Sequence, residues 1–371
     1  MMLWHNFIHP WMLDEAFISF RYAENWANGL GPVYNVGEKV EGYTTFLWVA
    51  ILALGNKVGF ETIALAKIVS YHTAFFTLGI LIFLNKIILK IKKEVGVIAA
   101  LVTGTSGIFL PWPVSGMETS LFTLLLLLSV VSYLFSINQE INRKNLLITS
   151  LSLTLLTLTR PEGVLITGIL FIHYVLKYRN DWTWLILPFV TIYGGYFAWR
   201  AMYYQSFLPN TFYAKSGNML FQIFRGIRYT NRFVLASACI LVPALLWIMD
   251  RSCHRAKHLR IPLLGAIVLV YVSYIILVGG DIMPAFRFFV PILPIISLLA
   301  ASAFVYIFKD TRIVILATVI MVSYNFFQIA SHHELNAIYF EDNVVKEGKI
   351  VGTWLKENFP ADTVIATNTA G

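Results

Sequence analysis

Long apolar runs separated by short polar turns make up most of the chain. A helix of roughly 20 mostly apolar residues is enough to cross the hydrocarbon core of a bilayer. Runs near that length cover residues 64–85, 95–112, 118–136, 145–159, 162–177, 183–203, 233–250, 262–279, 288–308 and 312–330. The pattern predicts an all-α polytopic membrane protein that crosses the bilayer about ten times.

Two neighbouring runs, 145–159 and 162–177, are short for a span. Pro161 lies between them, and proline interrupts a helix because it lacks an N–H and its ring crowds the preceding turn. The sequence therefore predicts either a tight turn or two half-buried helices at this place.

The first 63 residues differ from the rest of the chain because their helical patterns are too short or too polar to span. Residues 14–28 predict a helix with Asp14, Ile18, Arg21 and Asn25 on one face. Residues 44–58 are apolar over only about a dozen positions, which favours an interfacial or re-entrant helix. The chain is thus divided into residues 1–63, a transmembrane bundle over 64–330, and a C-terminal segment over 331–371.

Composition agrees with lipid as the solvent for this chain. Hydrophobic residues make up 58% of it and charged residues only 13%, with a mean hydropathy of +0.70. Soluble domains are roughly a quarter charged. The net charge is +8, but no segment is both soluble and basic enough to bind a nucleic acid. We therefore expect the lipid bilayer, and no nucleic acid, as a partner.

Basic residues mark the turns that fall on one side of the predicted bundle. Because Lys and Arg concentrate in cytoplasmic loops, this side is predicted to be the cytoplasm. The residues are Lys86, Lys90, Lys92, Lys93, Arg143, Lys144, Arg251, Arg255, Lys257, Arg260, Lys309 and Arg312. The loop 204–232 breaks the rule, since it belongs to the outer side and still carries Lys215, Arg225, Arg228 and Arg232.

Ionisable residues recur in the short turns predicted on the outer side, usually beside Gly or Pro. Charged groups near a bilayer usually face a protein interior or a wet cavity, and we expect a shared cavity for this set. Its members, with the polar residues of the same motifs, are Asp14, Glu15, Glu41, Tyr43, Glu118, Arg160, Glu162, Asn210, Tyr213, Lys215, Asp281 and Arg287. Arg21, on the predicted helix 14–28, is a further candidate for substrate binding. Each motif alone is equally compatible with an ordinary polar loop.

The mixture of residue types points to a particular chemistry. A carboxylate can deprotonate a hydroxyl, and Lys or Arg can hold a phosphate through charge-assisted hydrogen bonds. Aromatic residues on the same side suit sugar or prenyl surfaces, although they are also common at membrane interfaces. Together these groups favour a donor in which a sugar is linked to a lipid phosphate.

Several blocks of the sequence resemble a known family. Residues 14–48, DEAFISFRYAENWANGLGPVYNVGEKVEGYTTFLW, are similar to the first outer loop of the GT-C membrane glycosyltransferases. They resemble in particular the terminal β-arabinofuranosyltransferase family of mycobacterial arabinogalactan and its bacterial relatives. Further blocks follow in order: SGMETSLF (115–122), LTRPEG (158–163), LPNTFYAK (208–215), VGGDIMPAFRFFVPILP (278–294) and VGTWLKENFPADTVIATNTAG (351–371).

The resemblance implies a GT-C type transmembrane helix bundle with interfacial helices in the first outer loop. It implies an inverting transfer of a sugar from a polyprenyl-phosphate donor to a glycan acceptor, outside the cytoplasmic (inner) membrane. Asp14 matches the catalytic position of the family's acidic pair, and Glu15 stands where a second aspartate is common. The other outer residues are then candidates for binding donor and acceptor, with Lys215, Arg287, Arg225 or Arg228 stabilising the phosphate.

The sequence leaves some alternatives open. No cofactor is required by this mechanism, although Glu118, Glu162 and Asp281 are also compatible with a divalent cation. The family has a helix before the acidic pair and a longer outer domain, so we expect a chain that is truncated at both ends, with 331–371 as the start of that domain. A membrane transporter or lipid flippase, or an inactive truncated glycosyltransferase, is the competing reading.

Overall fold

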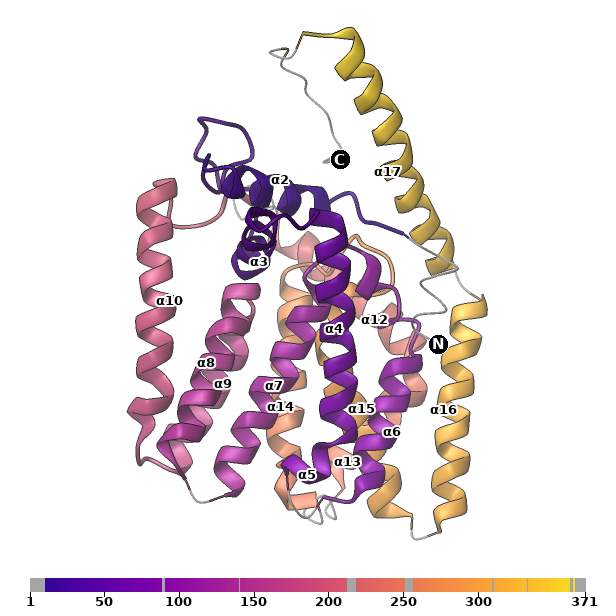
Figure 1. Cartoon of the computed structure of the whole chain (residues 1–371). Coiled ribbons are helices and arrows are strands. Elements are labelled where there is room, and N and C mark those ends of the chain that lie inside the picture. The colour runs from indigo at the N-terminus through magenta and orange to yellow at the C-terminus, as the bar shows by residue number, and fades with distance from the viewer. Residues whose placement is uncertain are drawn as a thin grey trace.

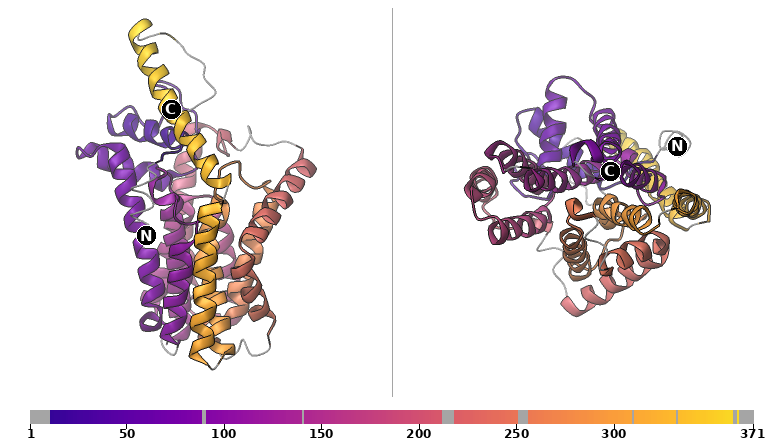
Figure 2. Two further views of the ribbon diagram at one scale, coloured as in Figure 1. Left: turned by 90° about the vertical axis from the view of Figure 1, so that its right-hand side faces the viewer. Right: turned by 90° about the horizontal axis from the view of Figure 1, so that it is seen from below.

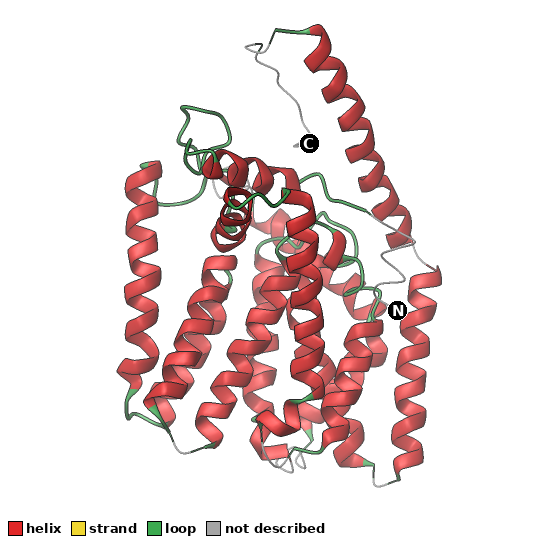
Figure 3. Ribbon diagram, viewed as in Figure 1, coloured by secondary structure: helices red, strands yellow, loops and turns green. Residues whose placement is uncertain are grey.

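The computed structural model of the protein describes residues 11–88, 91–139, 141–211, 218–250, 256–308, 310–331, 333–360 and 363, with the backbone alone over 328–342. This part of the chain consists of helices and connecting loops and contains no strand (Figure 3). The predicted all-α class is therefore confirmed.

Two helices of the first segment lie across one end of an upright bundle (Figure 1). They are α2 (Ala16–Ala27) and α3 (Phe46–Lys57), which pack on each other. Both match the helices predicted over 14–28 and 44–58. We call the end of the bundle that carries them the α2 end.

The bundle is made of helices that run up and down between its two ends (Figures 1 and 2). They are α4 (Thr62–Ile82), the short α5 (Leu84–Ile87), α6 (Lys93–Thr105), α7 (Thr119–Asn138), α8 (Arg143–Thr159), α9 (Gly163–Lys177), α10 (Trp182–Tyr204), α13 (Ala238–Met249), α14 (Ile261–Leu277), α15 (Leu293–Ile307) and α16 (Thr311–Ser331). The 3-10 turns η1 (Trp112–Val114) and η3 (Arg287–Ile292) precede α7 and α15.

The centre of the bundle is formed by α7 and α15, which are almost wholly buried. Helix α7 packs on α4 and α8, while α15 packs on α6 and α13. The sequence Ala300-Ala301-Ser302-Ala303 in α15 gives small side chains, which let helix backbones approach closely where lipid supplies no hydrophobic driving force.

Four stretches of the described chain are individually long and apolar enough to cross a membrane. They are Thr62–Ile82, Thr119–Asn138, Ala256–Leu277 and Arg287–Ile307. Helices α8 and α9 are shorter and are joined by the turn 160–162, so the tight turn predicted at Pro161 is confirmed. The number of ten spans stays a prediction.

One predicted span is wrong. Residues 233–250 do not form a single helix, because α12 (Met219–Ala236) ends at Ala236 and α13 begins two residues later with its axis bent by 96°. Much of the predicted loop 204–232 is therefore helical. The arginines of α12 lower its mean hydropathy, so the residues do not form an apolar run and were predicted as a loop.

Basic residues gather at the end of the bundle opposite α2, as predicted. Figure 1 shows α5 and the starts of α6, α8, α14 and α16 at that end. These starts carry Lys92, Arg143, Arg260 and Arg312. The final helix, α17 (His333–Asn358), continues beyond the α2 end (Figure 1). An outer domain beginning in 331–371 stays a prediction.

Packing of α12 on α14 depends on Gly226. A Cβ atom at this position would lie 2.2 Å from the backbone oxygen of Ile276, which no side chain can accommodate without movement of a helix. We therefore expect Gly226→Ala to lower the melting temperature of the purified protein, although alanine ordinarily stabilises a helix by about 1 kcal/mol relative to glycine. Gly168→Ala is the matched control, because nothing lies within 4 Å of a Cβ at that position in α9. An unchanged or higher melting temperature for Gly226→Ala would contradict this account of the α12–α14 contact.

Candidate active site

The acidic pair lies in a turn immediately before α2. Glu15 is the N-cap residue of the helix, but its side chain makes no capping hydrogen bond, and Asp14 precedes the cap position. The backbone oxygen of Asp14 accepts a hydrogen bond from the N–H of Phe17 at 3.1 Å. The position of Glu15 therefore does not depend on a side-chain cap.

The turn 115–118 holds this part of the chain in place. The N–H of Leu13 donates to the backbone oxygen of Ser115 at 3.1 Å. Gly116 has a φ of +81°, and a Cβ there would lie 2.9 Å from the Cβ of Ala16. Only glycine allows the turn to press against the start of α2, which brings Glu118 to the same end of the bundle as the acidic pair.

A buried arginine joins Glu118 to the turn between α8 and α9. The Arg160 Nε lies 2.7 Å from Glu162 Oε1, and its Nη1 lies 3.4 Å from Glu118 Oε1. Burial alone would lower the pKa of Arg160, but the carboxylates of Glu162 and Glu118 raise it above its ordinary value. The group stays a cation between two anions. Tyr274 of α14 adds a hydrogen bond to Glu162.

A second ion pair follows in the turn before η3. Arg287 Nε lies 2.6 Å from Asp281 Oδ2, and its Nη2 lies 3.3 Å from Oδ1, so the ion pair is bidentate. Phe288 lies between the two arginines, with its ring centroid 5.1 Å from the Arg160 guanidinium and 5.4 Å from that of Arg287. Cations over an aromatic face are attracted by its quadrupole. The two ion pairs therefore form one connected cluster.

Glu15 belongs to this cluster. Burial raises the pKa of its carboxyl above the ordinary value, with Asp14 and Asp281 acting in the same direction, whereas its own backbone N–H and Arg287 oppose the shift. Its Oε2 and the Oε2 of Glu118 are buried without a hydrogen-bond partner among the described residues. Both oxygens are acceptors that a hydroxyl-bearing ligand could satisfy.

Other predicted residues form a separate cluster on α10. Arg200 Nε lies 2.9 and 2.7 Å from the two oxygens of the Glu41 carboxylate, and both side chains are buried. The Tyr43 hydroxyl lies 3.2 Å from that of Tyr204. The Asn210 N–H donates to the Glu41 backbone oxygen at 3.0 Å. These contacts fasten the first outer segment to α10. The predicted outer residues therefore form two groups of contacts, and the cavity expected to join them stays a prediction.

Arg200 was not among the predicted site residues. It lies near the end of the apolar run 183–203, whereas the predicted site residues lie mainly in the turns. A charged residue inside a predicted span usually has an interior partner, and this rule could have identified it.

The remaining predicted residues lie apart from the ion pairs or cannot be placed. Arg21 is exposed on α2 and donates to the backbone oxygen of Tyr34 at 3.4 Å. Tyr213 and Lys215 lie outside the described residues.

The carboxylates of the first cluster do not gather as metal ligands. Within the described part of the chain, no three His, Cys, Asp or Glu residues are grouped so that they could hold a metal ion. Glu118 and Glu162 instead share Arg160, and Asp281 is paired with Arg287. Each of these carboxylates therefore has an arginine of the chain as its ionic partner.

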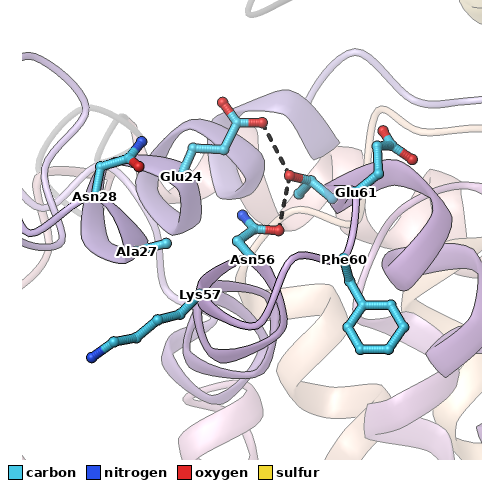
Figure 4. Close-up of a pocket in the computed structure, with 8 residues that line it drawn as sticks. Glu24, Ala27, Asn28, Asn56, Lys57, Phe60 and Glu61 are labelled. Atoms are coloured by element: carbon cyan, nitrogen blue, oxygen red, sulfur yellow. Dashed lines mark hydrogen bonds between the residues drawn. The ribbon is translucent and has the colours of Figure 1, made fainter.

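A cavity of about 400 Å³ lies at the other end of α2, where α2, α3 and the start of α4 meet (Figure 4). The Thr62 hydroxyl donates to Glu24 Oε1 at 3.0 Å or to Asn56 Oδ1 at 3.2 Å, and Glu61 caps α4. The twelve residues of α2 span about 18 Å, so this cavity is separate from the cluster around Glu15.

The sequence is similar to curated glycosyltransferases. The terminal β-(1→2)-arabinofuranosyltransferase of Corynebacterium glutamicum is 27% identical over 333 residues, which cover 79% of this chain and 48% of the relative. The enzyme of the same name from Mycobacterium tuberculosis is 34% identical over 73 residues, or 18% of this chain and 12% of the relative. The chain thus spans about half the length of the Corynebacterium relative. No family model matches the chain.

Solved structures with the same arrangement of helices are those of ArnT from Cupriavidus metallidurans. The form bound to undecaprenyl phosphate aligns with a TM-score of 0.59 at 12% identity, covering 84% of this chain and 59% of that one. The apo form aligns with a TM-score of 0.60 at 13% identity, covering 84% and 58%. The predicted fold and resemblance are both confirmed: this multi-pass membrane protein has the GT-C fold of ArnT and a sequence similar to the terminal arabinofuranosyltransferases.

Proposed function

We propose that this protein is an integral membrane glycosyltransferase that moves a sugar from a polyprenyl-phosphate donor to a hydroxyl of a cell-envelope glycan. The transfer inverts the anomeric carbon and takes place at the α2 end, which faces outward from the cytoplasmic membrane. The observation that carries this proposal is the cluster of Glu15, Asp281 and Arg287 beside Asp14. Support comes from the arabinofuranosyltransferase relatives and from the undecaprenyl phosphate bound to ArnT.

In the proposed reaction Asp14 is the general base. It takes the proton of the acceptor hydroxyl while the hydroxyl oxygen forms a bond to the anomeric carbon. The bond between that carbon and the phosphate oxygen breaks, and its electron pair leaves with the polyprenyl phosphate. Arg287 stabilises the charge on the departing phosphate, and Lys215 is proposed to do the same from its loop. A phosphate leaves readily, so no strong general acid is required.

Glu15 is proposed to keep the acidic pair at a single negative charge. Because burial and the neighbouring carboxylates raise its pKa, Glu15 holds a proton more readily than an exposed glutamate does. If Glu15 is neutral, no adjacent negative charge opposes ionisation of Asp14, since two close carboxylates disfavour double ionisation. Glu118 and Glu162, which Arg160 holds in place, would bind sugar hydroxyls.

A transporter is disfavoured by where the charges lie. Proteins that move ions or polar substrates across a bilayer carry ionisable residues along the pathway inside it. Helices α7, α13, α14 and α15 contain no Asp, Glu, Lys or Arg within their bounds. The ion pairs of the candidate site lie in the turns at the ends of these helices.

Replacing the proposed base tests the mechanism. We expect Asp14→Asn to leave folding and donor binding intact, because asparagine is isosteric, but to lower sugar transfer by roughly 10²- to 10⁴-fold, the range for a positioned acid or base. The measurement is transfer of radiolabelled sugar from a polyprenyl-phosphate donor by the purified protein in nanodiscs.

Glu38→Gln provides a control for loss of a carboxylate in the same outer segment. Glu38 is exposed, and among the contacts described its carboxylate accepts a hydrogen bond only from the Asn35 side chain. Transfer by this variant should stay near that of the unaltered protein. Near-normal transfer by Asp14→Asn would show that Asp14 is not the base, and loss of transfer in Glu15→Gln alone would then assign that role to Glu15.

The proposed orientation is tested by labelling single cysteines in intact cells. We expect an impermeant thiol reagent to label a cysteine placed at Ser206, in the turn after α10, and not one at Lys257. The expectation follows from the basic residues at the end opposite α2. Labelling at Lys257 without labelling at Ser206 would reverse the orientation and with it the proposed side of the reaction.

A further inference from the structure

Helix α12 presents three different faces along its length. Gly226, Tyr229, Thr230 and Phe233 form a buried face, which packs on α14. Leu220, Phe224 and Ile227 are exposed by 67%, 69% and 40% and form an apolar face. Arg225, Arg228 and Arg232 are spaced three and four residues apart, which places them in one stripe. We call this stripe the arginine strip.

The direction of α12 sets it apart from the bundle helices. Its axis is bent by 96° from that of α13, and α13 packs along α15 in the bundle. Helix α12 therefore crosses the flank of the bundle, as Figure 2 shows. A helix with an apolar face and a basic face in this orientation places the apolar face against acyl chains and the basic face at the level of the headgroups.

The arginine strip is joined to the loop that carries the Asp281–Arg287 pair. Arg225 Nε donates to the backbone oxygen of Gly279 at 2.7 Å. The Arg232 guanidinium lies 5.9 Å from the ring centroid of Phe286, the residue before Arg287. The arginine strip is thus linked to both ends of the loop 279–286, in which Asp281 is paired with Arg287 of the cluster around Glu15.

We propose that the arginine strip is a docking site for the phosphate of the polyprenyl donor, from which the donor passes to Arg287. This inference rests on the proposed function. Arginine binds phosphate with two parallel N–H donors, and the apolar face beside the strip accommodates the prenyl chain. Arg228 and Arg232 are exposed and receive the phosphate, while Arg225 fastens the strip to the loop 279–286. Continuity with Arg287 favours the donor over the headgroups of bulk anionic lipids.

Binding of an unglycosylated polyprenyl phosphate tests the strip without requiring catalysis. The probe is a long-chain polyprenyl phosphate titrated into the purified protein in nanodiscs of neutral lipid. We expect Arg228→Gln and Arg232→Gln each to weaken its binding by roughly 10-fold, as expected for loss of a charge-assisted hydrogen bond. Arg312→Gln, an exposed arginine at the opposite end of the bundle, removes the same charge and should leave binding unchanged. Melting temperatures of the three variants check that each is folded.

A parallel titration with phosphatidylglycerol distinguishes the donor from ordinary anionic lipid. Weaker binding of the polyprenyl phosphate alone supports the docking site. If the Arg228→Gln and Arg232→Gln variants lost affinity equally for both lipids, the strip would be a general surface for anionic lipids and the proposal would be overturned. Unchanged binding of both lipids would also overturn it. A protein that binds polyprenyl phosphate through the strip but transfers no sugar would uphold this inference and overturn the proposed function.

Discussion

The α2 end of the structure depends on one buried cation. Arg160 lies in the turn between α8 and α9 and is held by Glu162 of the same turn and by Glu118 at the start of α7. Removing one partner from a buried ion pair typically costs about 3–5 kcal/mol, because the other charge is left without compensation. Arg160 therefore fixes the positions of three helix ends at once, and the stacked Phe288 extends the constraint to α15.

Each outer segment is tied to this arrangement or to Arg200 through specific contacts. The start of α2 is pressed on the turn that leads to Glu118, and the loop before α3 is held on α10 by the Glu41–Arg200 pair. A buried salt bridge of this kind is weak evidence of added stability, because desolvation of the two charges offsets their attraction. The acidic pair is thus placed by chain segments that are far apart in sequence.

Much of this arrangement was predictable from the sequence, because the relevant residues stand in short polar turns between apolar runs. Asp14, Glu15, Glu118, Arg160, Glu162, Asp281 and Arg287 were all identified in that way. The contacts among them could not be predicted, since periodicity gives the face of a helix and not its neighbour. Arg200 was missed because it lies within an apolar run, and α12 was missed because its arginines interrupt the hydropathy that marks a span. The roles of these residues in catalysis stay predictions.

The sharp bend between α12 and α13 has a consequence for the surrounding lipid. With twelve residues, α13 is about 18 Å long, whereas the hydrocarbon core is about 30 Å thick. A hydrophobic helix shorter than the core is accommodated by local thinning of the bilayer, by flanking side chains that reach to the interface or by oligomerisation. Where the bilayer thins beside α13, headgroups lie closer to the midplane next to α12, and the protein itself shapes the patch of membrane from which a lipid would approach it.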